Sequence, residues 1–149
     1  MSAEQTTKAV GYVRVASGSA RKREGSVRIQ RQEILGYAKR NGIRIVRFFA
    51  DHDCIEDIAL RQGLSDAIAF ITSGKAQAVA VASLERLSAS FEDIVRFAEQ
   101  HWFLEAGPAL IAVKERLDTR TAEGRLALGV LGGVNRWEQE SQGREVQNV

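Results

Sequence analysis

Four short runs rich in β-branched residues recur along the chain, and a stretch with helical periodicity follows each of them. The runs have the length of strands and are bounded by polar or glycine-containing sequence. They cover residues 9–15, 44–49, 78–82 and 109–113. Strands that alternate with helices pair in parallel through right-handed crossovers. The alternation therefore predicts an α/β fold, with a single parallel-type sheet flanked by helices on both faces.

Between the runs, apolar residues recur at the i, i+3, i+4 spacing of amphipathic helices. We expect a first helix that is capped by Ser26 and ends near Arg40, and a second helix through residues 64–71. Ser90 and Asp93 have the spacing of a capping box, which predicts the start of a third helix.

The final segment, from about Thr121, can run as one long helix. Its apolar stripe consists of Ala127, Val130, Leu131, Val134 and Trp137, with Leu126 and Leu128 beside it. A helix that is apolar on more than one face usually packs on two partners. We therefore predict a body at residues 1–120 and a helix at 121–149 that joins a second copy. A charged residue at Leu128 should then weaken association without unfolding the sheet.

The composition excludes several classes of protein. The 149 residues fit one domain, and 44% hydrophobic with 27% charged residues is typical of globular proteins. One cysteine, Cys54, excludes a disulfide framework, and two histidines, His52 and His101, leave little for a metal site. No run approaches the ~20 apolar residues that cross a bilayer, and the N-terminus lacks the apolar core of a signal peptide. We expect no metal, no membrane contact and a cytoplasmic location.

Basic residues gather in the first third of the chain. The net charge is only +2, but residues 21–47 contain nine basic side chains against Glu24 and Glu33, so this segment carries +7. A basic stretch on a near-neutral protein predicts an anionic partner on one side. A solvated helix face is the alternative.

Polar side chains follow the predicted strands at their carboxyl ends, the edge at which parallel sheets bind ligands. They are Arg14 and Ser17, Asp51, Glu85 and Arg86, and Arg116 and Asp118, with Arg61 in the connection after the second strand. Arginine forks match phosphate oxygens, so the cluster predicts a site for a phosphodiester or phosphate ester. Surface ion pairs worth ~0–1 kcal/mol are the alternative. Residues 16–26 lack the pattern of a glycine-rich nucleotide loop.

Several short motifs stand in a characteristic order. They are GYVRVAS (11–17), SVRIQRQ (26–32), Asp51, LRQGL (60–64), SLERLSAS (83–90) and DTRTAEGRL (118–126). In order and spacing, from about residue 8 to 140, they resemble the catalytic domain of the serine recombinases, the resolvase/invertase family.

The resemblance implies a chemistry. In that family a serine at the end of the first strand attacks a DNA phosphodiester, and arginines stabilise the developing charge without a metal or other cofactor. It implies that Arg14, Arg61 and Arg86 bind the phosphate. It also assigns the motif glutamine to Gln30 and the aspartate to Asp51. DNA and a second copy, bound through residues 121–149, are the implied partners, and a full-length recombinase is a further one.

Three positions depart from the family pattern. Ala16 stands at the position of the nucleophile, Glu85 replaces the usual aspartate, and Ala89 replaces a second arginine. The sequence also stops at Val149, so we expect no separate DNA-binding domain. We therefore predict a catalytically degenerate relative that binds DNA weakly, with little sequence preference, as a partner or regulator.

Two alternatives stay open. The first is an active recombinase that uses Ser17 to form a 5′-phosphoserine link to DNA. Strand alternation argues against it, because Arg14 and residue 16 point to one face of the sheet and residue 17 to the other. The second is an unrelated α/β enzyme that binds phosphate.

Overall fold

The structure, a computed structural model, describes residues 6–15, 18–52, 58, 61–101, 103, 105 and 107–147, and in the last helix it places side chains through residue 132 and at 137, 138, 140 and 141. The elements follow in the order β1 (Thr7–Val15), α1 (Ala20–Arg40), β2 (Ile43–His52), α2 (Gln62–Thr72), β3 (Ala78–Val81), the short 3-10 turn η3 (Leu84–Arg86), α3 (Phe91–Gln100), β4 (Ala109–Ala112), β5 (Leu117–Asp118) and α4 (Ala122–Gln147).

The strands form one sheet in the order β2-β1-β3-β4-β5, and the first four strands are parallel. This confirms the predicted α/β fold and the long C-terminal helix. The fifth strand was not predicted, because two residues are too short to carry a pattern. β5 pairs antiparallel with β4 after a tight turn in which Arg116 adopts a φ of 53°.

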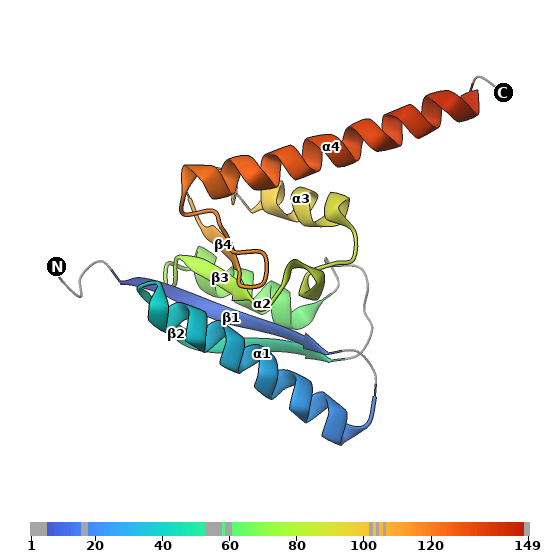
Figure 1. Ribbon diagram of the computed structural model, residues 1–149. Coiled ribbons are helices and arrows are strands. Elements are labelled where there is room, and N and C mark those ends of the chain that lie inside the picture. Colours follow the sequence, from blue (N-terminus) through green and yellow to red (C-terminus); the bar gives the residue numbers. More distant parts are fainter. Residues whose placement is uncertain are drawn as a thin grey trace.

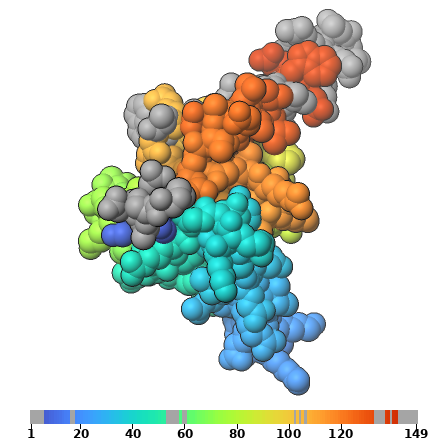
Figure 2. All heavy atoms as spheres, turned by 60° about the vertical axis from the view of Figure 1, so that its left-hand side comes forward, coloured from blue at the N-terminus to red at the C-terminus, as the bar shows by residue number. Residues whose placement is uncertain are grey.

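Helix α1 covers one face of the sheet, and α2 and α3 cover the other (Figure 1). Alternate residues of β1 point to opposite faces. Ala9 and Val13 pack with Ile34 of α1, whereas Val10 and Tyr12 belong to the larger core beneath α2 and α3. The amino-terminal half of α1 and the carboxyl-terminal half of α4 stand out from the body at opposite ends (Figures 1 and 2).

Two helix starts can be compared with the sequence. Helix α1 begins before the predicted cap at Ser26, because the hydroxyl of Ser19 already accepts a hydrogen bond from the amide of Lys22 at 3.2 Å. The capping box of α3 is confirmed, since the Ser90 hydroxyl accepts from the amide of Asp93 at 3.4 Å.

The face that α4 buries differs from the expected one. Leu128 is fully buried in the protein's own core, so the expectation that it serves association is wrong. Gly132 lies so close to α3 that a Cβ there would meet Cγ1 of Val95 at 2.7 Å. The exposed apolar residues of α4 are Leu126, Val130, Leu131 and Trp137. The side chain of Val134 lies outside the described part. No helix in the described part of the chain is long and apolar enough to span a membrane.

Candidate functional site

The carboxyl ends of β1, β2 and β3 meet at one edge of the sheet. Arg14 of β1 lies beside Asp51 of β2 in the strand register, and β3 ends at Val81, beside Tyr12. The turn η3 follows β3 and carries Arg86 to the end of β1. The structure therefore brings together side chains that are far apart in the sequence.

Asp51 is buried and caps helix α2 from another element. Its carboxylate accepts from the amide of Gly63 at 2.8 Å and from the amide of Leu64 at 3.0 Å. The close approach needs a glycine, because a Cβ on Gly63 would lie 2.3 Å from the carbonyl oxygen of Ala50. Asp51 thus fixes the start of α2, and with it Arg61, the residue immediately before that helix.

Tyr12 completes this arrangement, and its polar role was not predicted from the sequence. Its hydroxyl donates to the Asp51 carboxylate at 2.7 Å. Burial raises the pKa of Tyr12 above its ordinary value, and the hydrogen bond to Asp51 and the charge of Asp51 raise it further. Tyr12 therefore remains a neutral donor. The available signal was its place two residues before Arg14, on the same face of β1.

Arg61 is only 1% exposed and reaches under the turn η3. One of its Nη atoms donates to the carbonyl oxygens of Arg86, at 3.3 Å, and of Leu87. Burial lowers the pKa of Arg61 and the nearby charge of Arg14 lowers it further, while Tyr12 and Asp51 act in the opposite direction. Arg61 thus holds the turn and adds positive charge beside Arg14.

The side chain of Gln30 forms hydrogen bonds with the backbone at the end of β1. Its side-chain amide accepts from the nitrogen of Arg14 at 3.2 Å and donates to the carbonyl oxygen of Arg14 at 3.0 Å. It also donates to the hydroxyl of Ser26 at 3.0 Å. Because the pairing with β3 stops at Tyr12, β2 is the one strand that pairs with Arg14 among the described residues, and the amide of Gln30 supplies further hydrogen bonds to its backbone. Gln30 therefore positions Arg14 and the residues that follow it.

Arg86 spans from η3 to β1. Its Nη1 donates to the carbonyl oxygen of Arg14 at 3.3 Å. Its Nε is buried and has no hydrogen-bond partner among the described residues. A buried N–H without a partner is costly, so this end of the sheet is not fully satisfied by the described residues alone.

Glu85, the neighbour of Arg86, is exposed and lines a cavity of about 420 Å³ beside it. The carboxylate that acts on the turn is instead Glu115, from the loop between β4 and β5. It accepts from the amide of Leu84 at 3.1 Å, where the side chain of Ser83 makes no capping bond. Sequence reasoning missed Glu115, because no motif marks a single acceptor in a tight turn.

Asp118 does not belong to this edge, which corrects the expectation from the sequence. Strand β5 runs antiparallel, so the chain returns toward the amino end of β1. Asp118 there pairs with Arg120 at 2.7 Å, and Arg120 also donates to the hydroxyl of Thr7 at 3.0 Å. Arg116 is exposed in the preceding turn.

Three residues singled out from the sequence, Ala16, Ser17 and Cys54, lie outside the described residues. Ala89 is described and exposed, after η3. Within the described ranges, no group of three or more histidine, cysteine, aspartate and glutamate side chains is arranged to hold a metal ion.

The sequence matches the family described as "Resolvase, N terminal domain" over residues 9–149. Among solved structures, the N-terminal catalytic domain of TP901-1 integrase is similar at 25% identity and a TM-score of 0.74, over 89% of this chain and 97% of that chain. A resolvase family site-specific recombinase from Streptococcus pneumoniae is similar at 24% identity and a TM-score of 0.71, over 95% and 94%.

A third structure has a related fold. It is the C-terminal catalytic domain of ISC1926 TnpA, described as an IS607-like serine recombinase. It is similar at 23% identity and a TM-score of 0.55, over 71% of this chain and 67% of that chain. A search of the curated proteins found no match.

Proposed function

The chain belongs to the resolvase family of serine recombinases, and from this premise we propose that it binds a DNA phosphate at its strand ends without cleaving the DNA. In this role it acts as a DNA-associated partner or regulator of recombination, as a homo-oligomer or beside a full-length recombinase.

The arginine cluster is the observation that carries the proposal. Arg14 and Arg86 are half-buried at the same edge of the sheet, and Arg61 lies beneath them. The buried Nε of Arg86 is a donor that finds no acceptor in the described part of the protein. Arginine binds phosphate oxygens through planar, charge-assisted hydrogen bonds, so several arginines at one end of the sheet favour a DNA phosphate as the ligand.

The side chain at position 16 is the reason to propose binding without cleavage. Attack on phosphorus needs an oxygen ~3–3.5 Å away and in line with the leaving oxygen. Alanine offers no such atom at the family's nucleophile position, two residues after Arg14. Ala89 also removes one arginine that would stabilise the transferred phosphate, so two parts of the catalytic apparatus are missing together.

The basic charge of residues 21–47 supports weak binding with little sequence preference. Phosphate contacts of this kind gain most of their free energy from counterion release, which does not depend on base sequence. Affinity should therefore fall steeply between dilute buffer and physiological salt.

Fluorescence anisotropy with a labelled duplex of mixed sequence tests the proposal. We expect salt-sensitive binding that Arg86→Gln weakens about tenfold, by loss of a charge-assisted hydrogen bond. Arg96→Gln is the matched control, since this substitution removes the same charge from the exposed face of α3, where Arg96 pairs with Glu92. Circular dichroism and urea unfolding of each variant establish that it is folded.

Three results would overturn the proposal. They are no binding in dilute buffer, a tight complex on one defined site that salt does not weaken, and an equal effect of Arg86→Gln and Arg96→Gln.

A further inference from the structure

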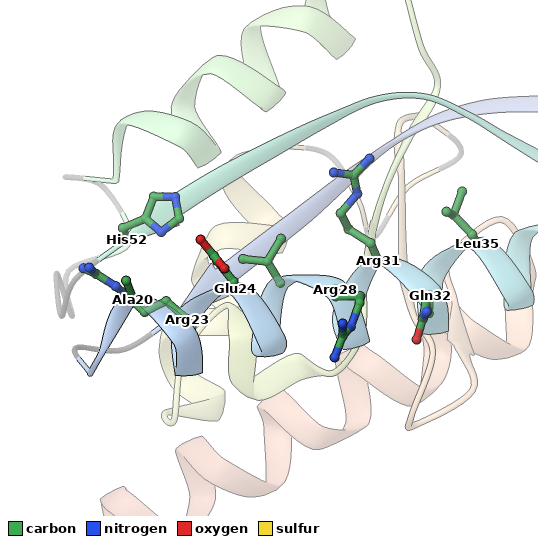
Figure 3. A pocket seen from close by; sticks show the side chains of 9 residues that line it. Ala20, Arg23, Glu24, Arg28, Arg31, Gln32, Leu35 and His52 are labelled. Carbon is green, nitrogen blue, oxygen red and sulfur yellow. The ribbon is translucent and has the colours of Figure 1, made fainter.

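A groove of about 790 Å³ lies between the amino-terminal half of α1 and the carboxyl end of β2, the outermost strand (Figure 3). It shares no lining residue with the strand-end site described above. Arg31 and Leu35 project from α1 toward β2, and His52 at the end of β2 lies across from Glu24. The groove is thus formed by one side of α1 and the last residue of β2.

The lining of the groove combines apolar surface with positive charge. Val27 is half-buried and Leu35 is 45% exposed, so both leave apolar surface in the groove. The guanidinium of Arg31 lies 4.6 Å from the centroid of the Phe48 ring. A guanidinium stacked on an aromatic ring is held in one orientation and keeps its N–H edge for a planar carboxylate.

The surroundings of the groove are strongly basic. Helix α1 carries seven basic and two acidic side chains, a net charge of +5. Arg23 and Arg28 also line the groove. An occupant of this groove must therefore be acidic, and it must also carry apolar groups to cover Val27 and Leu35.

The outer edge of β2 offers a second means of binding. This strand, Ile43–His52, pairs with β1 on its inner side and with no other strand of the described residues. Such an edge presents backbone N–H and C=O groups to which an extended chain can add as a further strand.

We propose that this groove and the edge of β2 dock an extended acidic segment of a partner protein, which turns both carboxylates and apolar side chains toward α1. Alternate side chains of an added strand point to opposite faces of the sheet. The residues that point toward α1 must therefore include carboxylates to meet Arg28 and Arg31 and an apolar residue to cover Leu35. Duplex DNA fits less well, because its phosphates use the arginines but leave the apolar lining and the strand edge without a partner. The proposal does not depend on the phosphate site or on cleavage.

A synthetic peptide in which pairs of glutamate alternate with pairs of valine is the probe, because this pattern places both residue types on each face of an added strand. Its binding to the full chain is measured by fluorescence anisotropy, and protection of the β2 amides is measured by hydrogen exchange. We expect the peptide to bind and to slow exchange along β2. A peptide with glutamine for glutamate should not bind, because it lacks the charge. A peptide with an N-methylated backbone should not bind, because it cannot add as a strand.

Arg31→Glu is the decisive variant, and we expect it to lower the affinity for the acidic peptide about tenfold or more. Arg40→Glu is the matched control, because it makes the same charge change in the last turn of α1, outside the groove. Both side chains are exposed, so both variants should fold, and urea unfolding verifies this.

The proposal is overturned if the acidic peptide fails to bind folded protein, or if the two variants lower its affinity equally. It is also overturned if the N-methylated peptide binds as well as the parent peptide. Both variants lower the basic charge of residues 21–47, so we expect each to weaken DNA binding to a similar extent. Displacement of the peptide by duplex DNA, together with a loss of DNA binding in Arg31→Glu that exceeds the loss in Arg40→Glu, would assign the groove to nucleic acid instead.

Discussion

Among its single residues, the strand-end site depends on side chains that form hydrogen bonds with backbone groups. Asp51 caps α2, Gln30 hydrogen-bonds to the backbone of Arg14, and Arg61 donates to carbonyl oxygens at the end of the turn η3. In the sequence they look alike, as polar residues at motif positions. Only the structure separates these positioning residues from Arg14 and Arg86, the half-buried arginines that we propose contact the phosphate.

Asp51→Asn tests this positioning role. In the parent protein the Asp51 carboxylate accepts from the Tyr12 hydroxyl and from two backbone amides of α2. The variant puts a neutral amide in its place, so we expect the free energy of unfolding to fall by about 2–3 kcal/mol. Tyr12→Phe removes one hydroxyl from the same cluster and should cost about 1 kcal/mol. Urea unfolding measures both. If Asp51→Asn is as stable as the parent protein, Asp51 does not hold the start of α2.

At the scale of elements, the turn η3 depends on residues outside it. Glu115 accepts from the amide of Leu84 at its beginning, and Arg61 donates to the carbonyl oxygens at its end. The turn carries Arg86, so its stability controls how that side chain is presented.

Hydrogen exchange of the Leu84 amide tests the contribution of Glu115. Glu115→Ala removes the acceptor and should speed exchange about fivefold, which corresponds to one hydrogen bond of about 1 kcal/mol. Glu115→Gln keeps an acceptor oxygen and should retain most of the protection. Equal exchange in the two variants would contradict the capping role.

Some helices and strands could be predicted from the sequence, and others could not. The four parallel strands and the capping box of α3 rest on local patterns, and the sequence predicted them. The early start of α1 was missed because the helix continues through Gly25 and Ser26, residues that often mark a helix boundary. Asp118 was predicted at the wrong end of the sheet, because β5, which reverses the direction of the chain, is only two residues long and shows no periodicity in the sequence.

Helix α4 has two apolar faces, of which one is buried and the other is exposed. One face, which contains Leu128, packs on the body of the protein. The other carries Leu126, Val130 and Leu131, which are between 39% and 68% exposed. The sequence predicted two faces but assigned Leu128 to the wrong one, because burial depends on how α4 lies across α3.

We propose that the exposed face mediates self-association, and two variants separate the faces. Leu126→Glu should weaken association while changing the stability of the fold by no more than about 0.5 kcal/mol. Leu128→Glu buries an unpaired charge and should unfold the protein. Analytical ultracentrifugation gives the association constant. A parent protein that remains strictly monomeric at roughly tens of micromolar would contradict the proposal.

We propose that the protein retains a phosphate site of the family type without its nucleophile. The most direct test incubates the parent protein, Ala16→Ser and Ser17→Ala with supercoiled DNA, followed by a denaturing gel for covalent protein–DNA adducts. We expect no adduct with the parent protein or with Ser17→Ala. Ala16→Ser should give at most a trace, because loss of a charge-stabilising group such as the arginine absent at Ala89 costs ~10²–10³ in rate. An adduct with the parent protein that Ser17→Ala abolishes would contradict the claim and identify Ser17 as the nucleophile.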